Sequence, residues 1–445
     1  MPAILSLMKP TYAEVEHALL GRWPETKLEP SLTRIRALCD LMGDPQRSYP
    51  VIQLTGTNGK TSTSRMIDNL IRELGLRTGR FTSPHLESMR ERICVDGEPL
   101  SEELFIDAFS DVAAYAQVVD DSSEHPLSFF EMVVGMAYAA FADTPVEVGI
   151  VEVGMGGAWD ATSVADAQVA VVMPIDVDHS RYLGDSPAEI AVEKAGIIKP
   201  RSHAVLADQA GAPADVLLQR AAEVGATVVR EGVDFSVLDR TPGVGGQVLT
   251  IGGTTRTYDD VFLPLYGVHQ AQNAACAIAA VEGFLGGKEL DPQFVREAFA
   301  SLTSPGRLEV VRRSPTILLD AAHNPHGMRA VVEAVQESFT LSPLVGVVGV
   351  MADKEVDGVL EALEPVLAQI VCTQNTTDRA MPAPELGDIA EGVFGTDRVH
   401  IVPRLDDAIE RGVELADVGG VLITGSVVTA GQARILLGGG AEDVT

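Results

Sequence analysis

A glycine-rich stretch followed by a lysine and two hydroxyl side chains is the part of the chain best suited to bind phosphate. Its residues, Gly56-Thr57-Asn58-Gly59-Lys60-Thr61-Ser62, lie between a short apolar run at 51–54 and a helical pattern of apolar residues at 61–74. The start of a helix offers free backbone N–H groups and the positive end of the helix dipole to an anion. Lys60 adds a positive charge there, and Thr61 or Ser62 offers a hydroxyl to Mg²⁺. This stretch predicts a nucleotide phosphate site.

The stretch departs from the strict phosphate-loop pattern at one position. Leu54 stands six residues before Lys60, where that pattern has glycine, so only the shorter form Gly56-x-x-Gly59-Lys60-Thr61 is present. The alternative is a structural turn that contains Gly-Lys-Thr without binding anything. The strand, turn and helix around it favour nucleotide binding.

Other polar residues follow predicted strands. Glu152 lies in an apolar run at 146–153, and a carboxylate there is costly unless it is paired or bound to a metal. We therefore expect Glu152 to bind Mg²⁺ or to orient a ligand of it, with a carboxylate satisfied by a neighbouring cation as the alternative. Ser83 follows the predicted strand at 78–82 and His179 ends another apolar strand, although a lone histidine is often structural. Ligands of open α/β sheets bind at the carboxyl ends of the strands, so these residues are expected to meet.

Three further charged residues need an explanation. Lys194 lies in an apolar helical segment at 187–199, where a buried lysine without a partner would lose its charge. Arg307 follows a predicted linker and suits either a γ-phosphate or a salt bridge across a hinge. Asp320 ends the first predicted strand of the second domain, where it can hold a ribose or orient Arg307.

The hydrophobic periodicity predicts an α/β protein of two domains. The first, at 1–300, has a mostly parallel central sheet with a small antiparallel insertion at 234–265. Residues 301–306 form a linker, and residues 307–445 form a smaller, Rossmann-like domain with alternating strands and helices. The expected strands are at 51–54, 78–82, 146–153, 169–174, 203–207, 227–231, 315–320, 344–350, 369–373, 398–402 and 420–425. The expected helices are at 11–20, 31–41, 61–74, 101–120, 128–142, 187–199, 213–224, 269–285, 291–302, 325–338, 355–366, 383–392, 405–415 and 428–437.

Composition excludes several classes of partner. A formal net charge of −30 over 445 residues disfavours nucleic acid, whose backbone requires a basic surface. No apolar run reaches the roughly 18–20 residues of a membrane span, and the first residues lack the pattern of a secretory signal. The 4 cysteines are scattered and suit a reducing compartment. We expect a cytoplasmic monomer that binds small molecules, with no nucleic-acid or membrane partner.

The residues by themselves indicate a two-domain enzyme that binds Mg²⁺ and ATP in the cleft between its domains. They leave open whether it is a transferase, a ligase or a hydrolase.

Nine motifs then carry a resemblance over nearly the whole chain. They are GTNGKT (56–61), TSPHL (82–86), VEVGMGGAWDAT (151–162), DHSRYLG (178–184), EKAGIIK (193–199), HQAQN (269–273), SPGRLE (304–309), DAAHNP (320–325) and ITGS (423–426). Their order is similar to that of folylpolyglutamate synthase/dihydrofolate synthase, the folate branch of the Mur ligase family. The resemblance implies a ligase of folate and one-carbon metabolism. ATP would phosphorylate a carboxylate of dihydropteroate or a folate, and L-glutamate would attack the acyl phosphate, releasing ADP and phosphate.

The resemblance also implies roles for individual residues. The ATP-binding set is Gly56, Thr57, Asn58, Gly59, Lys60, Thr61, Ser62, Asn273, Arg307 and Asp320. The metal set is Thr61, Ser83, Glu152 and His179, for two Mg²⁺ ions with K⁺ as an additional cation. The residues expected to act in the reaction are Lys60, His179, Lys194, Arg307 and His323, with Lys194 carbamylated by CO₂. Glutamate would meet His323 and Ser426. The pterin or pteroate would meet Ser128, Phe129, Phe130, Glu131, Trp159, Asp160 and Ala161, with a core aromatic as the alternative for Phe130.

The chain departs from the family pattern at three positions. Ala158 stands where a polar residue such as arginine is usual, and Ser163 stands where asparagine is usual. Both follow Gly157, so they bear on pteroate affinity and on dihydrofolate synthase activity. Thr61 stands where folate enzymes often have glycine, which leaves open whether Thr61 or Ser62 reaches the metal.

Three alternatives remain. A monofunctional folylpolyglutamate synthase would lack the dihydropteroate reaction. Another amino-acid ligase of the family, such as a cell-wall enzyme, would carry a full domain before the phosphate loop, where this chain has only some 50 residues. A regulatory nucleotide-binding module would be expected to lose some of Lys60, Glu152, His179 and Lys194, and all four are present.

Overall fold

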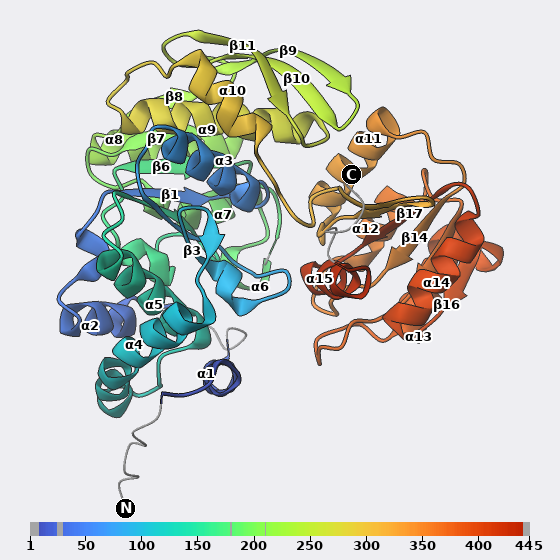
Figure 1. Cartoon of the computed structure of the whole chain (residues 1–445), viewed down its shortest axis with the longest axis horizontal. Helices are drawn as coiled ribbons and strands as arrows, with labels where there is room; N and C mark the ends of the chain where they lie inside the picture. Colours follow the sequence, from blue (N-terminus) through green and yellow to red (C-terminus); the bar gives the residue numbers. More distant parts are fainter. Residues whose placement is uncertain (1–8, 25–29, 179, 210, 439–445) are drawn as a thin grey trace, which may run out of the picture.

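The computed structural model describes residues 9–24, 30–178, 180–209 and 211–438. These residues form a larger domain around an eight-stranded sheet and a smaller domain around a six-stranded sheet, joined by the segment that follows α10 (Pro292–Ala300; Figure 1). A three-stranded antiparallel sheet belongs to the larger domain. The predicted fold class, a mostly parallel ATPase-type domain with an antiparallel insertion and a Rossmann-like second domain, is confirmed.

The eight-stranded sheet has the order β4-β3-β2-β5-β1-β6-β7-β8, and it is parallel from β2 to β8. Strands β3 and β4 extend it antiparallel at one edge, and the sequence pattern did not predict these two short strands. The strand bounds are β1 Val51–Thr55, β2 Thr78–Phe81, β3 Ile93–Val95, β4 Glu98–Pro99, β5 Val148–Glu152, β6 Val169–Val172, β7 His203–Leu206 and β8 Thr227–Arg230. The insertion has β9 Ser236–Gly243, β10 Gly246–Gly252 and β11 Thr257–Leu263.

Helices cover both faces of this sheet, which explains why its central strands are apolar on both sides. Neighbouring residues of β1 point to opposite cores: Ile52 belongs to the cluster under α3 and α9, whereas Val51 belongs to the cluster under α4 and α5. The helices are α1 Tyr12–Leu20, α2 Thr33–Leu41, α3 Lys60–Glu73, α4 Glu102–Ser122, α5 Phe129–Asp143, α6 Ser180–Leu183, α7 Pro187–Lys194, α8 Ala212–Val224, α9 Val268–Phe284 and α10 Pro292–Ala300. Short 3₁₀ helices span Pro45–Arg47, Met89–Arg92, Ala161–Val164 and Ala195–Ile197.

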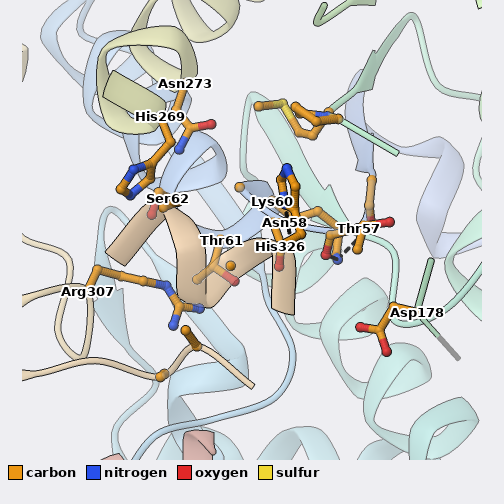
Figure 2. Close-up of a pocket in the computed structure, with 18 of the residues that line it drawn as sticks. Thr57, Asn58, Lys60, Thr61, Ser62, Asp178, His269, Asn273, Arg307 and His326 are labelled. Carbon is orange, nitrogen blue, oxygen red and sulfur yellow. Dashed lines mark hydrogen bonds between the residues drawn. The ribbon is translucent and has the colours of Figure 1, made fainter. Parts of the chain in front are cut away.

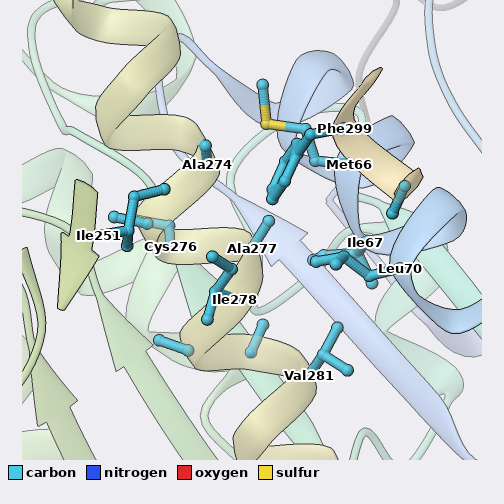
Figure 3. Packing of buried hydrophobic residues seen from close by; sticks show 14 of the residues in the cluster. Met66, Ile67, Leu70, Ile251, Ala274, Cys276, Ala277, Ile278, Val281 and Phe299 are labelled. Carbon is cyan, nitrogen blue, oxygen red and sulfur yellow. The ribbon is translucent and has the colours of Figure 1, made fainter. Parts of the chain in front are cut away.

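The packing of α3 against α9 fixes the position of the phosphate loop. Met66, Ile67 and Leu70 of α3 face the small side chains of α9, including Ala274 and Ala277 (Figure 3). Alanine on α9 lets the two helices approach closely, and all of these side chains are buried. The start of α3 is therefore held by a dry core, as a rigid ligand site requires.

The second sheet has the order β12-β13-β17-β14-β15-β16. It is parallel except at β12, an antiparallel edge strand that the sequence pattern did not predict. The strands are β12 Glu309–Arg313, β13 Thr316–Leu319, β14 Leu344–Val348, β15 Gln369–Cys372, β16 Val399–Ile401 and β17 Gly420–Thr424. The helices are α11 Pro325–Ser338, α12 Val356–Leu363, α13 Ala383–Phe394, α14 Leu405–Ala416 and α15 Val427–Leu436, with a 3₁₀ helix at Thr396–Arg398.

Ion pairs join the two domains outside the cleft. Arg434 of α15 contacts Glu87 of the larger domain and lies 3.0 Å from Glu309 Oε1 of β12. Arg240 of the insertion donates to Glu337 of α11, with 2.7 Å between Nη1 and Oε2.

Within the described part of the chain, no helix combines the length and the apolar character that a bilayer crossing needs.

Candidate functional site

A cavity of about 540 Å³ lies between the two domains, at the carboxyl ends of β1, β5 and β13. Most of the predicted site residues line it, as the rule for open α/β sheets leads one to expect. They are Gly56, Thr57, Asn58, Gly59, Lys60, Thr61, Ser62, Ser83, Glu152, Lys194, Asn273, Arg307, Asp320 and His323. Figure 2 shows Asn58 and His326 at the centre of this cavity, with Arg307 on one side and Asp178 on the other.

The phosphate loop requires glycine at two positions. Gly56 has a φ of 149°, and a Cβ atom built there would lie 2.5 Å from the Cβ of Met173. Gly59 has a φ of 86°, and its Cβ would lie 2.7 Å from Asn273 Oδ1. At both positions the backbone conformation and the nearby atoms leave no room for a side chain.

Lys60, Thr61 and Glu152 form the polar centre of the loop. Lys60 Nζ donates to the carbonyl oxygens of Gly56 at 2.9 Å and Thr57 at 3.1 Å. The Thr61 hydroxyl lies 3.0 Å from both carboxylate oxygens of Glu152, which is 1% exposed. Burial raises the pKa of Glu152, and nearby Lys60 and the Thr61 hydroxyl oppose that rise. Burial also lowers the pKa of Lys60, while Glu152 counteracts this.

Lys194 lies beside the loop, at the end of α7 and not in the middle of a helix as the sequence pattern had indicated. The helix stops there, and residues 195–197 form a 3₁₀ turn. Its Nζ donates to the carbonyl oxygen of Gly56 at 2.8 Å, and the residue is 5% exposed. Burial and the charge of Lys60 lower the pKa of Lys194 to about 7. A buried amine with this pKa is largely uncharged just above neutral pH.

Arg307 and Asp320 enter the cavity from the second domain. In Figure 2 the Arg307 side chain extends towards Thr61. The Asp320 carboxylate accepts backbone N–H bonds from Leu308 at 2.8 Å and Ala322 at 2.7 Å. Burial raises the pKa of Asp320, and Arg307 opposes the rise. Asp320 therefore links the backbone of Leu308, next to Arg307, to the turn that follows β13.

The other end of the cavity is less charged. Asn273 Nδ2 donates to Gln270 Oε1 at 3.1 Å, and Gln270 Nε2 lies 3.4 Å from the Ser62 hydroxyl. His269 lines the same end, and burial together with Arg307 lowers its pKa to about 4. Neutral amides and a neutral imidazole suit the base or ribose of a nucleotide better than its phosphates.

The sequence motifs did not single out Asp178 or Lys354 as site residues; Asp178 lines both this cavity and a smaller one of about 230 Å³, which Lys354 also lines. Lys354 Nζ lies 2.8 Å from Asp178 Oδ1, and both side chains are 11% exposed. His323 Nε2 lies 3.8 Å from Asp178 Oδ2, and burial and the Lys354 charge lower the pKa of His323 to about 4. Lys354 follows the predicted strand at 344–350, so the rule of polar residues at strand ends could have found it.

The predicted pteroate residues lie beside this cavity at the start of α5 and after β5. Several have structural partners: Ser128 and Glu131 form the capping box of α5, and Asp160 accepts from the Met155 backbone at 3.0 Å. Phe129 is buried under the Arg92 guanidinium. Ala161 is also buried. Phe130 and Trp159 are half-buried, and they pack against Gly154 and Gly156, which line the cavity.

Ser426, predicted to meet glutamate, is not among the described residues that line the cavity. Ser426 caps α15, accepts from the Thr429 backbone at 2.9 Å and is buried. His179 lies outside the described residues. Among those described, no group of three or more His, Cys, Asp and Glu side chains is arranged to hold a metal ion. Glu152 and Thr61 nevertheless offer hard oxygen atoms beside the loop, the type of ligand that Mg²⁺ prefers.

Family models match both domains. The Mur ligase middle domain matches residues 54–281, and the Mur ligase glutamate ligase domain matches residues 306–427. The chain is 47% identical to a dihydrofolate synthase/folylpolyglutamate synthase of Mycobacterium tuberculosis, over 96% of this chain and 93% of the relative. It is 30% identical to the protein of that name from Bacillus subtilis, over 82% of this chain and 85% of the relative.

Solved structures agree with the sequence relatives. Folylpolyglutamate synthase of Mycobacterium tuberculosis complexed with ADP and AMPPCP matches with a TM-score of 0.93 at 48% identity, covering 96% of this chain and 98% of that one. FolC of E. coli in complex with DHPP and ADP matches with a TM-score of 0.84 at 27% identity, covering 96% and 98%.

Proposed function

The chain belongs to the Mur ligase family, in its folylpolyglutamate synthase/dihydrofolate synthase branch, and we propose that it uses ATP to join L-glutamate to a carboxylate of dihydropteroate or a reduced folate. One observation carries the proposal. The phosphate loop with Lys60, the buried Glu152 of the first domain and Arg307 of the second domain face a single cavity. Such a site can bring an anionic triphosphate and an anionic carboxylate together, which a chain with a net charge of −30 would otherwise repel.

The reaction has two steps. A carboxylate oxygen of the pteroate or folate attacks the γ-phosphorus of ATP, the bond to the β,γ-bridging oxygen breaks, and ADP leaves. The amine of glutamate then attacks the acyl carbon, inorganic phosphate leaves, and one proton is released. Lys60 and Arg307 bear positive charge at the positions where the phosphoryl oxygens gain negative charge.

The loop residues Gly56 to Ser62 hold the triphosphate through backbone N–H groups, and Asn273 contacts the base. Thr61, Ser83 and Glu152, with His179, would hold Mg²⁺, which neutralises phosphate charge when it is bound. Two Mg²⁺ ions with K⁺ remain the proposed cation set. His323 is neutral at physiological pH because its pKa is lowered to about 4, so it orients the incoming glutamate and does not store a proton.

Lys194 is the proposed site of carbamylation. Its pKa of about 7 leaves an uncharged amine that can add CO₂. The carbamate would place a negative charge near Lys60, whose positive charge destabilises the ammonium form of Lys194. The modification thereby replaces a repulsion between two cations with an attraction.

Phe130 and Trp159 are the proposed aromatic contacts of the pterin, because their rings pack beside the glycines of the cavity wall. The buried polar residues Ser128, Glu131 and Asp160, together with Phe129 and Ala161, would shape that wall from behind. Ser426 would act on glutamate through the backbone at the start of α15.

The proposed functional division of the chain is 1–300, 301–306 and 307–445. The proposed state is a cytoplasmic monomer, whose four cysteines are free and buried.

The test is ADP release from Mg²⁺–ATP and L-glutamate, with dihydropteroate and tetrahydrofolate supplied separately. Turnover with both would establish a bifunctional enzyme in which Ala158 and Ser163 are tolerated. Turnover with tetrahydrofolate alone would leave a dedicated polyglutamate synthase. No glutamate-dependent ADP release with either, from protein that still binds ATP, would contradict the proposal.

A further inference from the structure

Asn58 belongs to the phosphate loop, but its side chain contacts the second domain. Its amide forms a reciprocal pair with the amide of Asn324: each Nδ2 lies 3.2 Å from the Oδ1 of the other. Asn58 Nδ2 also lies 2.8 Å from His326 Nδ1. An amide nitrogen has two hydrogens, so it can donate to both partners. Figure 2 shows Asn58 and His326 meeting in the cavity.

Asn324 continues the contact back into the first domain. Its Nδ2 lies 3.2 Å from Asp178 Oδ2, and Asp178 Oδ1 in turn accepts from Lys354 of the second domain at 2.8 Å. The hydrogen bonds therefore run Asn58–Asn324–Asp178–Lys354 and cross between the domains at each step. His323 lies at the side of this path, 3.8 Å from Asp178.

The position of the Asn324 amide is fixed by the helix that follows it. Asn324 is the N-cap of α11, and its Oδ1 accepts from the Gly327 backbone at 2.8 Å. This bond orients Oδ1 towards the helix and leaves Nδ2 to face Asn58 and Asp178. The residue is 3% exposed, so few water molecules compete for these bonds.

We propose that Asn58 and Asn324 form an interdomain clasp that positions Lys354 and His323 over the phosphate loop when glutamate reacts. This inference rests on the proposed function. The side chain of Asn58 docks the second domain, while the backbone of the loop remains available to phosphate. Asn324 is thus a positioning residue that acts through Asp178, and it is not expected to touch ATP.

Two substitutions separate the clasp from the helix cap. Serine is a good N-cap but is too short to reach Asn58 and Asp178, so N324S removes the clasp and keeps α11. N324D also keeps the cap, but it places a carboxylate beside Asp178. E87Q is the matched control, because it removes an interdomain ion pair with Arg434 that does not reach the phosphate loop.

We expect N324S to lower kcat/KM for glutamate by about 10- to 100-fold, because small misplacements of reacting groups have effects of this size. N324D should lower it further, since two carboxylates then repel. ADP affinity by calorimetry and the melting temperature should stay close to wild type in both variants, and E87Q should keep wild-type kinetics. An N324S variant with wild-type glutamate kinetics, or an E87Q variant with the same loss, would overturn the clasp.

A second measurement does not depend on the reaction. Small-angle X-ray scattering should give a larger radius of gyration for N324D than for the wild type and E87Q, because repulsion at Asp178 opens the cleft. If the wild type shows no glutamate-dependent ADP release, the proposed function fails and the scattering alone decides the clasp. Identical scattering from N324D and wild type would then reject it.

Discussion

At the residue scale, the site depends on ionisable side chains held where burial opposes their charge. Burial raises the pKa of Glu152 and lowers the pKa of Lys60 and Lys194. The charged form of each group is less stable by itself than it would be beside a ligand of opposite charge. The site is therefore prepared for a metal, a phosphate or a chemical modification, and each of these can be tested separately.

Lys194 should react with CO₂ in a pH-dependent manner. Its pKa falls from 10.5 to about 7 in the folded chain, so the reactive neutral amine becomes abundant as the pH rises through 7. After addition of ¹³C-bicarbonate, the wild type should show a carbamate resonance by NMR that grows between about pH 6 and 8. K194R should show none at this site, because a guanidinium stays protonated. Equal resonances in both proteins would place the modification elsewhere.

Glu152 should control the acid side of the activity profile. Its pKa lies above the ordinary 4.5, so its negative charge is present above the folded-state pKa and is lost as the pH falls through it. We expect E152Q to lower kcat/KM by about 10²–10³-fold, the usual size of a lost electrostatic contact to a transition state. Measured from about pH 5 to 8, the variant should also lack the acid limb of the wild type. Unchanged activity and an unchanged requirement for Mg²⁺ would remove Glu152 from the metal site.

At the scale of elements, the turn between β1 and α3 carries the strongest constraint. An alanine at position 59 would have to adopt a φ of 86°, and its Cβ would lie 2.7 Å from Asn273 Oδ1. G59A should therefore weaken ATP binding by at least about tenfold and destabilise the fold by about 1–3 kcal/mol. G75A is the matched control, because Gly75 has a φ of 78° with nothing within 4 Å.

Calorimetric ATP titration and urea unfolding of both glycine variants would check this prediction. G75A should cost about 1 kcal/mol of stability from backbone strain and leave ATP affinity unchanged. If G59A binds ATP as tightly as G75A does, the close approach to Asn273 has no role in shaping the nucleotide site.

The sequence predicted elements better than it predicted contacts. Long periodic segments such as α3 and α9 were predicted because their own packing pattern identifies them. Strand β12 was missed because it is an edge strand whose residues are only half-buried, so it lacks a clear apolar pattern. The Asn58–Asn324 pair joins residues 266 positions apart, and no local pattern encodes such a contact. Motif spacing found Glu152 and Lys194, but only the fold relates Asp178 to Lys354.

At the scale of the whole molecule, folding two domains around one polar cleft has a consequence for acid stability. His269 and His323 both have a pKa of about 4, against 6.5 for an exposed histidine. Between these values the unfolded chain binds more protons than the folded chain, so these histidines reduce stability as the pH falls from 6.5 to 4. Buried carboxyl groups such as Asp320 and Glu152 act in the opposite direction, because their pKa values are raised.

Because the two effects oppose each other, a difference between variants is the informative quantity. H269Q removes one titrating group and keeps a neutral polar side chain, so its urea-unfolding free energy should decline less than that of the wild type below pH 6.5. H17Q, at an exposed position of α1, is the control for a histidine-to-glutamine substitution outside the cleft. If the unfolding free energies of H269Q and the wild type instead fall in parallel down to pH 4, His269 titrates alike in the folded and unfolded chains. The end of the cleft that would hold the base is then open to water. A smaller decline for H269Q alone would mean that the domains exclude water from this end even without a nucleotide.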